Sequence, residues 1–148
     1  MPIHVVSIVF VSLLMLLSLT GCKETENKPN SDKLTLSYAD FVANVNPVLN
    51  LNIGGKTCSA SGCHNVNGGS GGAFKIFANA VSTSELTANF ISAKSFANLV
   101  SASESKLLLE PLTGTFSSVG SHAGGDIFTL GDANYTIIFN WINNPVSN

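Results

Sequence analysis

Two cysteines and a histidine lie close together in residues 58–64, the stretch of the chain whose residue types point most clearly to a chemical function. Four residues separate Cys58 from Cys63, and His64 follows the second cysteine directly. Thiols placed this way can each add across one vinyl group of a porphyrin, and the adjacent imidazole then ligates the iron. Two residues between the cysteines is the usual spacing, so this loop is wider, but the Cys-His pair that places the ligand is kept. We therefore expect one covalent haem c, with His64 as the proximal iron ligand.

The same residue types allow two other interpretations. A disulfide between Cys58 and Cys63 is chemically reasonable in an exported protein, but it closes only a small loop and gives His64 no role. Zinc could take both cysteines together with two histidines, yet the direct Cys-His adjacency suits haem better. The disulfide alternative would make the chain a non-redox lipoprotein that acts as an interaction domain.

The third cysteine, Cys22, ends a segment with the pattern of a lipoprotein signal. Residues 5–19 are almost entirely apolar but too few for a spanning helix, and small residues stand just before the cysteine. The segment resembles a bacterial lipobox, although no Lys or Arg precedes the apolar run. It predicts a signal peptide at residues 1–21 and a lipid on Cys22 that anchors the chain at a membrane surface. The expected location is the outer membrane, facing the periplasm or the cell surface.

The candidates for the second axial ligand of the iron can be reduced by elimination. Met is a common partner of His in cytochromes c, but both methionines, Met1 and Met15, belong to the predicted signal peptide. Outside that peptide the histidines are His64 and His122, and glycines beside His122 let the backbone approach a cofactor. We expect His64 and His122 to ligate the iron together, with a lower reduction potential than a His/Met pair gives. The alternative is an iron left open or bound by Lys, which would favour ligand binding or peroxidase-like chemistry.

The composition fits one small exported domain behind a flexible tether. Charge is sparse, with a net charge of −2, and Lys supplies every basic side chain. Because no basic stripe is present, nucleic acid is not expected as a partner. Residues 22–36 are expected to form the lipid anchor and tether, and residues 37–148 the haem domain. No pair of catalytic carboxylates and no nucleophile constellation is found in the sequence, so enzyme activity is not expected.

Helical periodicity predicts the elements that position these residues. Ser37 is a helix N-cap followed by apolar residues at helical spacing, and Pro47 is expected to interrupt this helix and open a fresh turn. Asp132 is expected to cap a last helix, and a short helix is expected at residues 95–100. We expect the first and last helices to meet across the haem, and the chain without haem to be poorly folded.

A glycine-rich stretch surrounds the cysteine motif. Seven glycines fall within residues 54–72. A phosphate-binding loop would need a preceding strand and a following helix N-terminus, and neither flank is convincing. The stretch is better explained as a loop that wraps closely around a flat, bulky group, where side chains would clash. Residues 73–91 show only a weak alternation of small and apolar residues.

The order of these features resembles exported bacterial monohaem cytochrome c domains, including the planctomycete-type ones. The resemblance implies a compact all-α, cytochrome c-like fold with long glycine-rich loops around a covalent haem. It supports His122 as the distal ligand, although Ala123 is an insertion in the His-Gly-Gly pattern. A membrane-anchored electron carrier is implied, working with redox partner proteins that the sequence does not identify. The matching segments are residues 46–49 (NPVL), the widened CSASGCH motif, the glycine-rich loop after it, residues 103–111, residues 122–125 (HAGG) and the closing helix.

Overall fold

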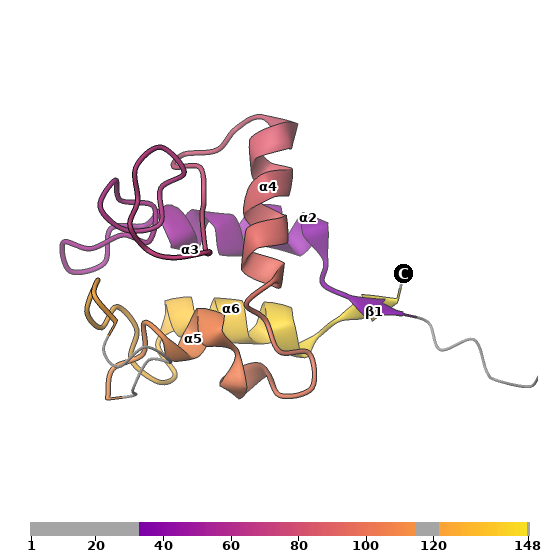
Figure 1. The fold of residues 1–148 in the computed structure, drawn as a ribbon. Coiled ribbons are helices and arrows are strands. Elements are labelled where there is room, and N and C mark those ends of the chain that lie inside the picture. Colours follow the sequence, from indigo (N-terminus) through magenta and orange to yellow (C-terminus); the bar gives the residue numbers. More distant parts are fainter. Residues whose placement is uncertain (1–32, 115–121, 148) are drawn as a thin grey trace, which may run out of the picture. The chain divides into compact units, whose positions relative to one another are not determined.

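The computed structural model of the protein describes residues 33–114 and 122–147. Helices joined by long loops make up most of this part of the chain (Figure 1). No helix within the described residues is both long and apolar enough to cross a membrane. Cys22 and the predicted signal peptide lie outside the described residues, and so do residues 115–121.

The first helical segment begins where the sequence predicts. Ser37 is its N-cap, and its hydroxyl accepts a hydrogen bond of 3.1 Å from the Asp40 N–H, which satisfies one of the free donors at the helix start. The segment consists of α2 (Tyr38–Asp40), η1 (Phe41–Val45) and α3 (Asn46–Asn50) in direct succession.

Pro47 changes the hydrogen-bond pattern of this segment without breaking it. η1 is a π-helical turn, in which the Asn46 N–H donates to the Phe41 carbonyl, and Pro47 then occupies the first turn of α3. A proline has no N–H to donate, and it is tolerated in the first turn of a helix, where the N–H would lack a partner anyway. The expected interruption at Pro47 thus takes the form of a π turn followed by a new helical turn.

Helix α4 (Thr83–Lys94) lies in a stretch for which the sequence predicts no regular structure. It starts with a capping box, in which the Ser82 side chain accepts from the Glu85 N–H and the Glu85 carboxylate accepts from the Ser82 N–H. The short helix expected at residues 95–100 was wrong, because these residues form turns and irregular chain after α4. Val100, at the end of this stretch, is 97% exposed.

Three shorter elements complete the helical part. η2 (Ala102–Glu104) and α5 (Lys106–Leu109) follow the turn after α4, and α6 (Ala133–Asn143) closes the fold. Asp132 caps α6 as predicted, since its carboxylate accepts a hydrogen bond of 2.7 Å from the Tyr135 N–H.

The first helical segment and α6 pack directly against each other. The rings of Phe41 and Trp141 lie 5.4 Å apart, and the indole N–H of Trp141 donates to the Ser37 carbonyl over 3.0 Å. Both aromatic side chains are almost completely buried. The two helices therefore touch at this contact, whereas from the sequence we expected them to meet across a cofactor.

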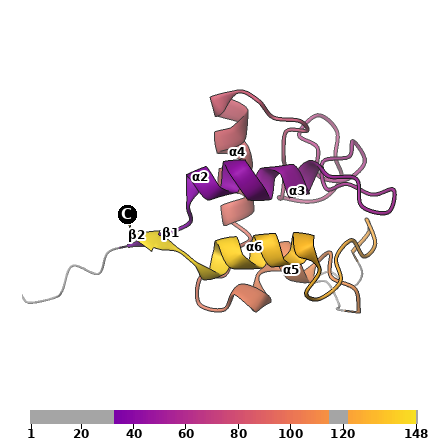
Figure 2. The same ribbon diagram turned by 180° about the vertical axis from the view of Figure 1, so that it is seen from behind.

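A two-stranded antiparallel sheet joins the ends of the described part. β1 (Leu34–Thr35) pairs with β2 (Val146–Ser147), and Leu36 behind β1 is only 2% exposed. Residues 34–36, expected to be part of the tether, therefore belong to the folded part. Figures 1 and 2 show the sheet at the α2 end of the first helical segment and the loops of residues 51–82 beyond its α3 end.

Candidate functional site

The cysteine-histidine segment is folded into tight turns by its own backbone. The Cys63 N–H donates to the Ala60 carbonyl over 2.9 Å, and the His64 N–H donates to the Cys58 carbonyl over 3.0 Å. These bonds bring the ends of the four-residue spacer together. The wider spacing between the cysteines is thus compatible with a compact loop, in which both cysteines and His64 border the same cavity.

The two thiols are free and differ in exposure. Cys58 is buried and Cys63 is half-buried, and no disulfide joins them. Burial raises the pKa of the Cys58 thiol to about 11, with a smaller contribution from the nearby Cys63. Cys58 is therefore held as the protonated thiol at neutral pH.

His64 is oriented by a backbone carbonyl. Its Nδ1 lies 2.9 Å from the carbonyl oxygen of Phe74, and because a carbonyl can only accept, Nδ1 carries the proton. Partial burial lowers the pKa of His64, and the neighbouring His122 lowers it further, while the Phe74 hydrogen bond acts in the opposite direction. The neutral ring with a free Nε2 lone pair is the form that binds a metal.

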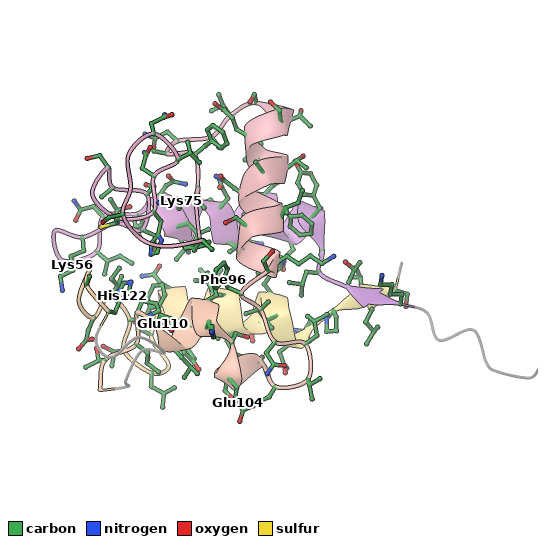
Figure 3. All side chains as sticks on the ribbon, in the orientation of Figure 1. Lys56, Lys75, Phe96, Glu104, Glu110 and His122 are labelled. Carbon is green, nitrogen blue, oxygen red and sulfur yellow. The ribbon has the colours of Figure 1, made fainter. Side chains whose placement is uncertain are left out.

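His122 is held in the same way on a separate loop. Its Nδ1 lies 2.9 Å from the Gly125 carbonyl, so Nδ1 is again the donor and Nε2 is left free. The loop is tied in place by the Gly125 N–H, which donates to the His122 carbonyl, and by the Lys56 ammonium, which donates to the Asp126 carbonyl over 3.2 Å. Figure 3 shows His122 and Lys56 close together beyond the ends of the helices.

The two predicted ligands lie close together with nearly parallel rings. The ring centres of His64 and His122 are 6.0 Å apart, and the ring planes differ by only 12°. A metal–imidazole bond is about 2 Å long and the ring centre lies about 1 Å behind the nitrogen, so two imidazoles on one metal ion have centres about 6 Å apart. The observed ring-centre separation has this same value, and the Nε2 atom of each ring is left free by the hydrogen bond at its Nδ1.

A glycine-rich loop packs behind His64. The Gly71 N–H donates to the Cys63 carbonyl over 2.8 Å, and a Cβ added at Gly71 would overlap the His64 ring, 2.6 Å from its Cε1. A Cβ at Gly69 would lie 2.7 Å from the Asn65 backbone nitrogen. These glycines are therefore needed because the loop approaches the cysteine-histidine segment itself, in addition to bordering the cavity.

Two cavities meet at the histidine pair. The larger has a volume of about 500 Å³ and the smaller about 170 Å³. The larger volume lies in the range of about 300–1,000 Å³ that is usual for sites of bulky organic ligands. Its walls are mainly apolar, built from Leu49, Phe74, Phe96, Leu107 and Phe128. The two cavities share Cys58, Cys63, His64, His122 and Gly124.

The two histidines suit a metal ion whose remaining coordination positions are filled by another ligand. Within the described residues, no three or more His, Cys, Asp or Glu side chains come together as a metal-ion cluster. Two opposed imidazoles alone are a poor site for a bare ion, which usually takes at least three protein ligands. They are sufficient for an iron whose equatorial positions are occupied by a porphyrin.

Four of the residues that border the site were predicted from the sequence, and several others were missed. Cys58, Cys63, His64 and His122 all line both cavities, whereas Cys22 lies outside the described residues. Lys106 and Glu110 also line the larger cavity and were not predicted. These two residues are four positions apart and enclose three leucines, so a helical turn brings them near one another. This spacing was the sequence signal that could have indicated them.

The chain was compared with known protein families, with curated protein sequences and with solved structures, and none of them matches it.

Proposed function

We propose that this protein is a monohaem c-type cytochrome that carries single electrons at a membrane surface. The observation that carries the proposal is the pair of His64 and His122, whose ring centres are 6.0 Å apart, next to two free thiols on one apolar cavity. Free thiols, paired imidazoles and apolar cavities each occur separately in proteins without haem. Together they match the three needs of a covalent haem: two axial nitrogens, two thioether sulfurs and an apolar enclosure.

Cys58 and Cys63 would hold the porphyrin. Each thiol would add its S–H across one vinyl group, with the sulfur bound to one vinyl carbon and the hydrogen to the other, so no oxidant would be needed. Because both thiols are free and both border the larger cavity, the reaction needs no prior reduction of a disulfide.

His64 and His122 would hold the iron through their Nε2 atoms. Their Nδ1–H groups donate to the Phe74 and Gly125 carbonyls, which fixes ring orientation and makes the free nitrogens better donors. When bound, the haem supplies the one-electron redox chemistry. Two strong ligands leave no open position on the iron, which favours electron transfer over ligand binding or peroxidase-like chemistry.

The remaining parts of the proposal concern the setting of this domain. We propose a cytochrome c-like, all-α fold, export behind the signal peptide at residues 1–21, and a lipid anchor on Cys22. The donor and acceptor would be redox proteins that reach the haem at the membrane surface. The support for the anchor is the sequence pattern before Cys22.

The proposal is tested by producing the full chain in cells that carry a cytochrome c maturation system. The expected product is red, keeps its haem in acidified acetone, and has a mass increased by one haem. Cys63→Ser should greatly reduce the haem content, and a Cys58→Ala/Cys63→Ala double variant should carry none. A colourless wild-type chain would contradict the proposal and would favour the interaction domain with a Cys58–Cys63 disulfide.

A further inference from the structure

The apolar wall of the larger cavity is interrupted by one basic and one acidic side chain. Lys106 is the first residue of α5, and Glu110 follows that helix directly as its C-cap. Both border the cavity together with Phe96 and Leu107. Lys106 is exposed and Glu110 is half-buried. Figure 3 shows Glu110 and Phe96 in the same region of the molecule as His122.

The ammonium group of Lys106 differs from the other cations near the site. The Lys56 ammonium donates to the Asp126 carbonyl, and the Lys75 ammonium donates to the Gly69 carbonyl. Within the described residues, the Lys106 ammonium has no hydrogen-bond or ion-pair partner. A basic residue four positions before an acidic one, as Lys106 is before Glu110, is also the less favourable order for an ion pair on a helix.

We propose that Lys106 binds a carboxylate of the bound haem and neutralises its charge beside the apolar wall of the cavity. This inference rests on the proposed function. A haem attached through its vinyl groups to Cys58 and Cys63 must direct its two propionate carboxylates away from the cysteines. A carboxylate against an apolar wall is costly to bury unless a cation pairs with it. Within the described residues, Lys106 is the one lysine that lines the larger cavity.

The charge of Lys106 also has a defined effect on the iron. A positive charge near the haem disfavours ferric iron relative to ferrous iron, and therefore raises the reduction potential. Removal of Lys106 should lower the potential for two reasons: the cation is lost, and the carboxylate that it neutralised acts fully on the iron. Glu110 has the opposite charge, so Glu110→Gln should raise the potential.

The first test is a zero-length cross-link in the haem-loaded full chain. A water-soluble carbodiimide condenses a carboxylate and an amine that are in contact, with loss of one water, which the reagent takes up. Peptide mass spectrometry should then find the peptide with Lys106 joined to the haem-bearing peptide of Cys58 and Cys63. The inference would be overturned by any of three results. The haem is linked only to Lys56 or Lys75, Lys106 is linked only to Glu110, or no link to the haem is found.

The second test compares potentials among charge variants. Lys106→Met should lower the potential so that the ratio of oxidised to reduced protein rises several-fold at a fixed electrode potential, where tenfold corresponds to about 59 mV. Lys106→Arg should restore the wild-type value. Lys94→Met is the matched control, because Lys94 binds the Thr35 hydroxyl and borders neither cavity. An equal shift in Lys106→Met and Lys94→Met would overturn the inference.

The two proposals fail in distinguishable ways. A chain that takes up no covalent haem overturns the proposed function and this inference with it. A chain that carries haem but shows no Lys106 cross-link and no specific shift in potential overturns this inference alone.

Discussion

Gly71 lies so close to His64 that any side chain there must displace the ring. A Cβ at Gly71 would overlap His64, 2.6 Å from Cε1, and the loop that carries Gly71 is bonded to the Cys63 carbonyl. We expect Gly71→Ala to weaken or break the His64–Phe74 hydrogen bond, to destabilise the fold by about 1–3 kcal/mol, and to add a high-spin fraction to the haem spectrum.

Asn67→Ala provides the control for this prediction. Asn67 lies shortly after the cysteine-histidine segment, its side chain is exposed, and it borders neither cavity. This variant should have wild-type stability and spectrum. Equal effects of the two substitutions, measured by urea unfolding and absorption spectroscopy, would contradict the positioning role of Gly71.

The two cysteines should differ in reactivity when no haem is attached. Burial both shields Cys58 and raises its pKa to about 11, whereas Cys63 is half-buried. A thiol reacts as its thiolate, so the alkylation rate of Cys58 should keep rising with pH up to about 11 and should not level off near 9. At about pH 8, iodoacetamide should modify Cys63 at least tenfold faster than Cys58. Tandem mass spectrometry distinguishes the two sites, and equal rates would contradict the burial of Cys58.

Local spacing made part of the site predictable from sequence. Cys58, Cys63 and His64 are neighbours in the chain, so their common location needed no knowledge of the fold. His122 was found by eliminating other ligands, and its position opposite His64 depends on two loops that the sequence does not relate to each other. Lys106 was missed because a charged residue beside leucines is usually a solvated helix position.

Asn89 connects helix α4 to the segment that orients His64. The Asn89 side chain is completely buried; it accepts from the Phe77 N–H over 2.7 Å, donates to the Phe77 carbonyl over 3.0 Å, and donates to the Asn46 side chain over 2.9 Å. It thereby fixes the chain just after Phe74, whose carbonyl accepts from His64. A helix that contains no site residue thus contributes to the position of His64, the proposed iron ligand.

Asn89→Ala should therefore be costly for the whole fold. The substitution leaves buried donors and acceptors of Phe77 and Asn46 without partners, and we expect a loss of about 3 kcal/mol in the free energy of unfolding. Asn140→Ala on the exposed surface of α6 is the control and should change stability by less than about 0.5 kcal/mol. Similar losses in the two variants, measured by urea unfolding, would contradict this role of Asn89.

The helix termini were predictable where the sequence contains a recognisable N-cap residue. The helix interiors were not predictable in the same way. Ser37 and Asp132 were identified as caps and act as caps. α4 was missed because its apolar residues are spread around the helix, although Ser82 and Glu85 form a capping box that could have indicated its start. The weak periodicity of α4 reflects its position, since its buried face contributes the polar Asn89 as well as Ala93.

The interior of the described part of the chain is of two kinds, one closely packed and one hollow. Near Phe41 and Trp141 the helices pack directly and fill their own space, whereas near His64 and His122 the chain surrounds a cavity of about 500 Å³. The size of this cavity could not be predicted from sequence, because it depends on how separate apolar walls meet. The sequence indicated only that a glycine-rich chain would need a large apolar group to complete its core.

The haem-loaded protein should be far more stable than the same chain without haem. Filling the cavity restores contacts to its apolar walls, and the thioether and axial bonds tie together loops that are distant in sequence. We expect the melting temperature of the haem-loaded protein, measured by circular dichroism, to be higher than that of the haem-free chain by roughly 10 °C or more. The Cys58→Ala/Cys63→Ala chain serves as the haem-free sample. Equal melting of the two samples would contradict the role of haem as part of the core.

The most direct test of the central claim, that His64 and His122 hold one haem iron together, is the absorption spectrum of the haem-loaded chain with and without carbon monoxide. The wild-type protein should show sharp low-spin bands after reduction by dithionite, and carbon monoxide should leave them unchanged. His122→Ala should keep its covalent haem, become high-spin, and bind carbon monoxide. A low-spin spectrum that persists in His122→Ala, or a wild-type protein that binds carbon monoxide readily, would contradict the claim.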